Sequence, residues 1–265
     1  MKHTTHSGAY LRSHLRLLLR VSRSEIGSRF AGSLLGIGWW MLNPLLLLAI
    51  YAAIYLLVLK VQAPQLDGAA YVVLIFTGIV PFLMSSEALL NGVSSVVANK
   101  SVLSNTVFPV DLIPVKAVLL AQITMVCGLT VVILGDLLLG RLTRWILLVP
   151  VILAFHILFL IGVVWILSLI NLVFRDLQNI IGIITMYLMI ASPIGYTPDM
   201  VPASMKLLLT LNPLAHFIVA YQDLIVFGRA PSAEQSLTIV MMSVAVFIMG
   251  GFFFARAKNT LVDYV

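Results

Sequence analysis

The chain has 265 residues, of which 61% are hydrophobic and 10% are charged, and its mean hydropathy is +1.10. Soluble domains carry roughly 25% charged residues, so this composition excludes a water-soluble fold. Because a helix needs about 20 apolar residues to cross a bilayer, roughly six crossings would use the whole chain. The net charge of +6 does not indicate nucleic-acid binding, because the basic residues cluster beside apolar segments, where they orient membrane proteins. The single cysteine, Cys127, excludes an internal disulfide.

The first 30 residues are rich in Arg and Ser and contain one acid, Glu25. On a helical wheel four arginines share one side and the leucines lie away from it, which is typical of a helix lying flat on a membrane surface. A mitochondrial presequence has a similar composition and is the alternative. A cleaved signal peptide is disfavoured, because the apolar run at 37–59 exceeds the roughly 7 to 15 residues of a signal. The arginines of the predicted interfacial helix are Arg12, Arg16, Arg20 and Arg23.

The apolar runs predict an all-α membrane protein with six transmembrane helices. The first run opens with Trp39 and Trp40, side chains that favour the headgroup boundary. The polar segment Ser94–Asp111 separates the second run from the third, and a short turn around Gly140 joins the third to the fourth as an antiparallel hairpin. The expected spans cover residues 37–59, 71–93, 112–138, 145–173, 179–196 and 237–255.

The stretch between the fifth and sixth expected spans combines five prolines with two apolar runs, each too short to cross a bilayer. Broken helices at membrane depth are tolerated where they pack on protein or line a water-filled cavity. We therefore expect re-entrant half-helices at 193–228, termed the gate segment, on the non-cytoplasmic side. A proline-rich external loop is the alternative. The residues assigned to the gate are Pro193, Tyr196, Pro198, Asn212 and Pro213.

The distribution of basic residues predicts that both termini are cytoplasmic. With six crossings and a cytoplasmic N-terminus, eleven of the 16 Lys and Arg residues lie inside, as the positive-inside rule requires. The five outside are Lys60, Arg141, Arg144, Lys206 and Arg229.

Sequence patterns for catalysis and for ATP binding are missing. The chain has no G-x-x-x-x-G-K-[ST] phosphate loop, no H-E-x-x-H or G-x-S-x-G motif, and no Cys or His pair at metal-ligand spacing. We therefore expect no catalytic residue, metal or cofactor in this chain. A proton-coupled carrier needs buried acids or bases, and Glu87, Asp136 and His156 make only a weak relay. We expect His156 to cap a neighbouring backbone group.

Polar residues form a stripe along the second expected span, through Asn91 and Ser94 with Glu87 beside them. Such a stripe forms either a wall of a hydrophilic path or hydrogen bonds between helices, and both interpretations stay open. Tyr51 and Tyr55 lie one turn apart on the first span and would offer a sugar-stacking face, although core packing is the commoner role of an aromatic. The possible substrate-path residues are Tyr51, Tyr55, Glu87 and Asn91.

Four stretches are more specific than any of these features. The first is RSEIGSRFAGSLLGIGWWMLNP from Arg23, and the second is NKSVLSNTVFPVDLIP from Asn99. The others are FRDLQNII from Phe174 and SPIGYTPDMVP followed by LTLNPLAHFIVAYQDLIVFG. In order and spacing they resemble ABC-2 type polysaccharide export permeases. Because the resemblance runs from about residue 10 to the end, we treat 1–265 as one transmembrane domain, with a cytoplasmic tail and interfacial helix at 1–35.

This resemblance implies the membrane half of an ABC transporter that exports a lipid-linked polysaccharide, such as an O-antigen, across a bacterial inner membrane. Two copies of the chain would pair around one path among membrane lipids, and two copies of a separate ATPase subunit would hold ATP and Mg²⁺. In the family, the segment between spans two and three is a coupling helix that docks on the ATPase. The residues that match this coupling segment (99–109) are Asn99, Lys100, Val102, Leu103, Phe108 and Pro109.

Two departures from the family pattern affect these expectations. The coupling segment has only one basic residue, Lys100, so apolar contact through Leu103 and Phe108 would carry more of the docking. Gln222 stands where relatives often have Arg. Other functional classes also fit parts of the sequence: an ABC-2 exporter of drugs or small lipids, a proton-coupled carrier and a membrane-embedded transferase. ATPase stimulation, sensitivity to an uncoupler, and activity without an ATPase would separate them.

Overall fold

The computed structural model describes residues 35–54, 57, 66–99 and 109–262. Within these ranges the regular elements are helices, and no strand occurs, so the expected all-α class is confirmed for this part of the chain. Several residues singled out in the sequence lie outside the described ranges: Arg12, Arg16, Arg20, Arg23, Tyr55, Lys100, Val102, Leu103 and Phe108.

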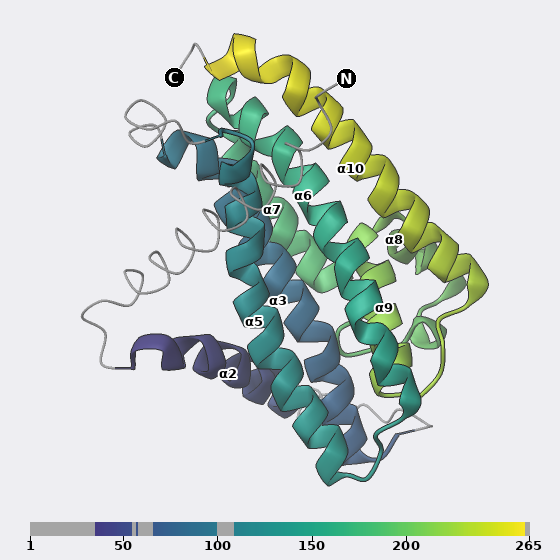
Figure 1. Cartoon of the computed structure of the whole chain (residues 1–265). Coiled ribbons are helices and arrows are strands. Elements are labelled where there is room, and N and C mark those ends of the chain that lie inside the picture. The colour runs from purple at the N-terminus through teal and green to yellow at the C-terminus, as the bar shows by residue number, and fades with distance from the viewer. Residues whose placement is uncertain (1–34, 55–56, 58–65, 100–108, 263–265) are drawn as a thin grey trace, which may run out of the picture.

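Four described helices are long and apolar enough to cross a membrane, and Figure 1 shows them side by side in one bundle. They agree with the second, third, fourth and sixth expected spans. The helix of the second expected span is longer than expected, because residues 94–98 continue it. The Ser95 hydroxyl bonds within this helix, donating to the Gly92 carbonyl oxygen at 2.7 Å. The four are α3 (Gly68–Ala98), α5 (Leu112–Leu138), η3 (Arg144–Leu148) continued by α6 (Val149–Val173), and α10 (Ala233–Val262).

The first and fifth expected spans contain shorter helices. These are α2 (Trp39–Ala53) and α7 (Leu177–Ala191), each of 15 residues. Fifteen residues make about 22 Å of helix, less than the roughly 30 Å of a hydrocarbon core. In Figure 1, α2 runs crosswise to α3 and α5, which it contacts. The described helices supply four spans, or up to five with the bent pair that follows α7, and the count of six stays a prediction.

A bent pair of helices lies between α7 and α10. After a short turn, η4 (Pro198–Met200), the segment formed by η5 (Ala203–Met205) and α8 (Lys206–Leu211) meets α9 (Pro213–Ile225) at 99°. The break falls before Pro213, which lacks an N–H and is pre-organised for the first position of a helix. A bend of this kind forms either one broken span or a re-entrant loop, so the re-entrant half-helices stay a prediction.

Helix α3 is the centre of the bundle and α10 lies at its edge. In an apolar stretch of 18 residues, 72% is buried in α3 but only 22% in α10. A wide apolar face of α10 is therefore left at the surface of the bundle. α10 is held to α6 by close backbone contact at Gly162 and Gly250. A Cβ atom on Gly162 would lie 2.6 Å from the carbonyl carbon of Val246, so only glycine allows this approach.

Candidate transport and coupling site

The coupling segment begins at a residue that joins two transmembrane helices. Asn99 ends α3, and its Nδ2 donates to the carbonyl oxygen of Ser95 at 2.7 Å. Its Oδ1 lies 3.5 Å from Nζ of Lys116, one turn into α5. The Lys116 side chain is only 7% exposed, so this contact is enclosed by the bundle. The first residue of the coupling segment is therefore attached to both α3 and α5.

A tryptophan holds the chain just after the coupling segment. Pro109, the last residue of the coupling segment, is half-buried. Its carbonyl oxygen accepts from the Leu112 N–H at 3.1 Å in the turn that leads into α5. Trp165 of α6 donates from Nε1 to the carbonyl oxygen of Asp111 at 3.0 Å. Its ring contacts Phe247 of α10, with centroids 5.2 Å apart. Sequence reasoning missed Trp165, because nothing in its own helix indicates a partner 54 residues away.

Buried polar side chains close the start of the gate segment. Asn212 accepts from the N–H groups of Leu214 and Ala215 through Oδ1, which caps α9, and donates to the hydroxyl of Ser192 at 2.9 Å. Gln222 donates to the carbonyl oxygen of Pro193 at 2.8 Å. These contacts bring the end of α7 against the bend at Asn212 and against the C-terminal half of α9. Three of the five predicted gate residues therefore lie together: Pro193, Asn212 and Pro213.

The two remaining predicted gate residues lie farther along the connection. The hydroxyl of Tyr196 donates to the carbonyl oxygen of Ala191, the last residue of α7, at 3.0 Å. Pro198 opens η4 and lines two cavities beside α9. Tyr71, in the first turn of α3, donates to the carbonyl oxygen of Gly195, which fixes the connection against α3. The structure therefore anchors this part of the gate segment at residues that the sequence did not single out.

A buried histidine joins three helices near the middle of the bundle. Nε2 of His156 on α6 lies 2.9 Å from the hydroxyl of Ser85 on α3, which itself donates to the Pro81 carbonyl oxygen. The Ser85 hydroxyl therefore contacts both the imidazole and a carbonyl oxygen of its own helix. The imidazole stacks on Phe217 of α9 with centroids 4.1 Å apart and planes 7° apart. His156 thus bonds a side chain on another helix, and the expected backbone cap is wrong.

The polar stripe on α3 makes a bond between helices. Oε2 of Glu87 accepts from the Thr124 hydroxyl of α5 at 2.7 Å, and Asn91 is half-buried on the same helix. Tyr51 of α2 is half-buried and packs against the core. The Glu87 contact matches the interpretation of the stripe as hydrogen bonding between helices. Assignment of these residues to a substrate path stays a prediction.

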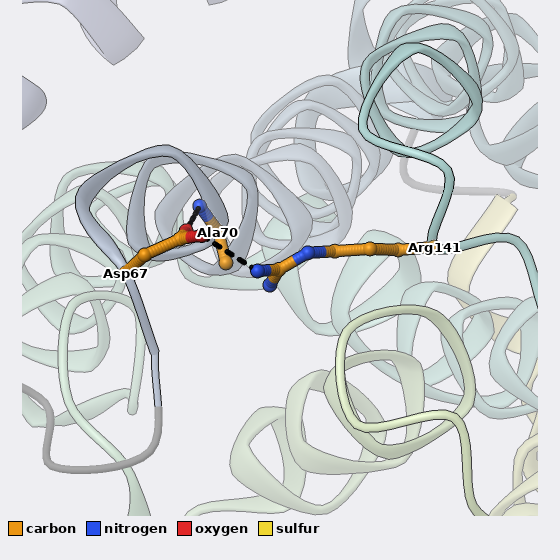
Figure 2. Close-up of polar contacts among 3 residues, drawn as sticks. All are labelled: Asp67, Ala70 and Arg141. Atoms are coloured by element: carbon orange, nitrogen blue, oxygen red, sulfur yellow. Dashed lines mark hydrogen bonds and ion pairs between the residues drawn. The ribbon is translucent and has the colours of Figure 1, made fainter.

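At the opposite end of the bundle, an ion pair connects α3 to the α5–α6 turn. Figure 2 shows that Asp67 uses both carboxylate oxygens: Oδ1 accepts from the Ala70 N–H at 2.8 Å, and Oδ2 pairs with Nη2 of Arg141 at 2.7 Å. The first contact caps α3, and the second attaches the cap to the turn between α5 and α6. Both side chains are partly exposed, at 61% and 35%, so solvent screens the pair and it contributes at most about 1 kcal/mol.

The long apolar helices and the buried polar contacts between them define a multi-pass helical membrane protein. The family model described as ABC-2 type transporter matches residues 16–226, and the chain belongs to this family. The chain is similar to two O-antigen export system permease proteins RfbA of Klebsiella pneumoniae, with 32% and 30% identity over 80% of this chain and 81% of each relative. An RfbA protein of Myxococcus xanthus is 25% identical over 94% of this chain and 95% of its own. The family resemblance inferred from the sequence is confirmed.

Proposed function

We propose that this chain is the permease subunit of an ABC transporter that exports a lipid-linked polysaccharide of the O-antigen type across a bacterial inner membrane. The observation that carries the proposal is the similarity to O-antigen export permeases along 80% or more of the chain. Two copies of the chain form one path, and two copies of a separate ATPase bind ATP and Mg²⁺. Both termini lie in the cytoplasm, with the N-terminal helix flat on the membrane surface.

The contacts at the coupling segment support a route for mechanical force. When the ATPase moves residues 99–109, the bonds of Asn99 to α5 and of Trp165 to Asp111 carry the movement into α3, α5 and α6. Packed helices move as rigid elements, so the displacement travels along them. Ser85 and His156 bring α3 and α6 against Phe217 of α9. Movement that begins at the ATPase thereby reaches the gate segment.

A deletion strain tests the export function. Loss of this chain should remove the polysaccharide from the cell surface while the lipid-linked precursor accumulates inside, and the wild-type chain should restore export only together with its ATPase. In inverted membrane vesicles supplied with ATP, transport should survive an uncoupler, because ATP supplies the energy. Surface polysaccharide that persists in the deletion strain, or export that collapses with the uncoupler, would contradict the proposal.

Substitutions in the coupling segment test its docking to the ATPase. Phe108→Ala and Leu103→Asp remove the apolar contacts expected there and should uncouple ATP hydrolysis from export in the intact complex. Thr106→Ala, in the same segment but with a polar side chain, is the matched control and should export normally. Unchanged export in both of the first two variants would exclude docking through these side chains.

Cysteine accessibility tests the re-entrant arrangement. Asn212 is buried, so the probe near the bend belongs at Leu211, which is 70% exposed, with a second probe at Asp199. In a Cys127→Ser background, both cysteines should react with an impermeant thiol reagent added outside the membrane. Reaction of position 211 only from the cytoplasmic side would require that each half of the bent pair crosses the membrane.

A further inference from the structure

A polar cavity of ≈260 Å³ lies at the C-terminal end of α9, between η4 and the turn that follows α9. Leu66, just before α3, forms part of its wall, so it opens at the same end of the bundle as the Asp67–Arg141 pair. Three charged side chains line it, in a chain of which only 10% of residues are charged: Asp199, Asp223 and Arg229. Polar groups that converge on a cavity beside an apolar ring are typical of a ligand-binding site.

Two of the charged groups of this cavity form an ion pair. Nε of Arg229 donates to Oδ1 of Asp223 at 2.6 Å, and the Arg229 N–H donates to the Asp223 carbonyl oxygen at 2.9 Å. Asp223 is 5% exposed. The Arg229 guanidinium lies 5.1 Å from the centroid of the Phe227 ring, which also lines the cavity. Donors, acceptors and an apolar ring therefore stand together in one wall, where the Arg229 side chain is 62% exposed.

The balance of charge disfavours an anionic ligand. Two carboxylates face one guanidinium that is already paired, so the wall carries net negative charge and repels phosphate or another anion. Among the described residues, no group of three or more His, Cys, Asp or Glu side chains is arranged to hold a metal ion. A sugar ring fits this wall, because its hydroxyls both donate and accept hydrogen bonds and its C–H face packs on an apolar ring such as Phe227.

Size and continuity agree with a sugar chain. The ≈260 Å³ cavity is just below the roughly 300–1,000 Å³ of pockets for drug-sized ligands, which suits a single sugar unit. A second, mainly apolar cavity of ≈310 Å³ adjoins it and shares Pro198 and Val219 as a common wall. Glu234 and Gln235 supply polar groups there. Neighbouring units of one chain would fill the two cavities in succession.

We propose that the cavity around Asp199, Asp223, Phe227 and Arg229 is a saccharide-binding site that holds a sugar unit of the exported glycan beside the gate segment. This inference rests on the proposed function for the identity of the glycan. Because η4 and α9 form opposite walls, an occupied site connects these two parts of the gate segment through the sugar. The site would therefore report the presence of substrate to the gate.

Protection of a cysteine from labelling tests the site in the purified permease–ATPase complex. Thr197→Cys lines the cavity and Leu208→Cys lies in a separate apolar cavity, both in a Cys127→Ser background. The probes are neutral monosaccharides: glucose, galactose, mannose, rhamnose and N-acetylglucosamine. At about ten times its Kd, a bound sugar should slow maleimide labelling of position 197 about tenfold, because only empty sites react. Labelling of position 208 should not change.

Two substitutions test the chemistry of recognition without removing the buried Asp223. Asp199→Asn removes a charge that is exposed, and Phe227→Leu keeps an apolar side chain but removes the ring; both should abolish protection. Asp176→Asn, an exposed acid at the other end of the bundle, is the control and should leave protection intact. Protection that persists in both variants, or that none of the sugars produces, overturns the site. Protection by inorganic phosphate or Mg²⁺ alone overturns it in favour of an ion site.

The deletion strain separates this inference from the proposed function. If deletion removes the surface polysaccharide but no sugar protects position 197, the saccharide site is wrong and the export function stands. If a sugar protects position 197 but deletion leaves the surface polysaccharide unchanged, a saccharide site exists and the export function is wrong.

Discussion

Close packing of α6 against α10 predicts a measurable cost for adding one methyl group at Gly162. A Cβ atom there would lie 2.6 Å from the carbonyl carbon of Val246 and 2.7 Å from the nitrogen of Phe247. Both are backbone atoms, which do not rotate away as a side chain does, so the two helices must separate. Overpacking of this kind costs about 1–3 kcal/mol, and the higher helix propensity of alanine offsets about 1 kcal/mol. We expect Gly162→Ala to destabilise the protein by up to about 2 kcal/mol.

Gly182→Ala is the matched control, because Gly182 lies inside α7 and its Cβ position has no atom within 4 Å. There the substitution should stabilise the helix by up to about 1 kcal/mol. The two variants should therefore differ by roughly 1–3 kcal/mol, or about 2–12 °C in Tm for a chain of this size. Thermal unfolding of both purified variants in one detergent measures the difference. If Gly162→Ala unfolds at or above the temperature of Gly182→Ala, the α6–α10 contact is looser than described.

Three further substitutions test other contacts. Arg141→Gln should lower stability by at most about 1 kcal/mol. A double-mutant cycle with Asp67→Asn should give a coupling energy that becomes smaller as salt is added. A coupling energy of zero at low salt would mean that the two side chains form no ion pair. Trp165→Phe keeps an aromatic ring but loses the N–H that donates to Asp111. The amount of polysaccharide exported per ATP hydrolysed should therefore fall, while stability drops by only about 1 kcal/mol. An unchanged ratio of export to ATP hydrolysis would exclude a coupling role for this bond. Gly140→Ala should lower stability by about 1–2 kcal/mol in thermal unfolding, because Gly140 has φ +66°; an unchanged Tm would contradict that backbone conformation.

The sequence predicted the long helices well because each is one uninterrupted apolar run. The third expected span, 112–138, coincides with α5 (Leu112–Leu138). The same reasoning missed the continuation of α3 to Ala98, because serines that are polar in isolation bond to the carbonyl groups of their own helix. It also located the break before Pro213 but not the direction of the bend, because proline fixes where hydrogen bonding stops and tertiary packing decides where the chain goes next.

Contacts between distant residues were beyond a single sequence. His156 was recognised as a buried base, but its partner Ser85 lies 71 residues away on another helix, and Phe217 lies on a third. The gate segment shows the same limit: its prolines were visible, while the anchoring contact from Tyr71 spans 124 residues. A polar residue in a membrane helix shows that a partner is needed. Only the packing of the helices identifies that partner.

Helix α3 connects the features that the sequence treated separately, because it contacts a different partner at each level of the bundle. Asn99 bonds α5 beside the coupling segment, Ser85 bonds α6 at mid-height, Tyr71 bonds the gate segment, and Asp67 pairs with the α5–α6 turn. Pro81 interrupts the hydrogen bonding of α3 one turn before Ser85. A helix bends most easily where proline removes a backbone bond. Pro81 therefore marks the place where α3 bends most easily, one turn from the residue that bonds His156 and so next to the helices that hold α9.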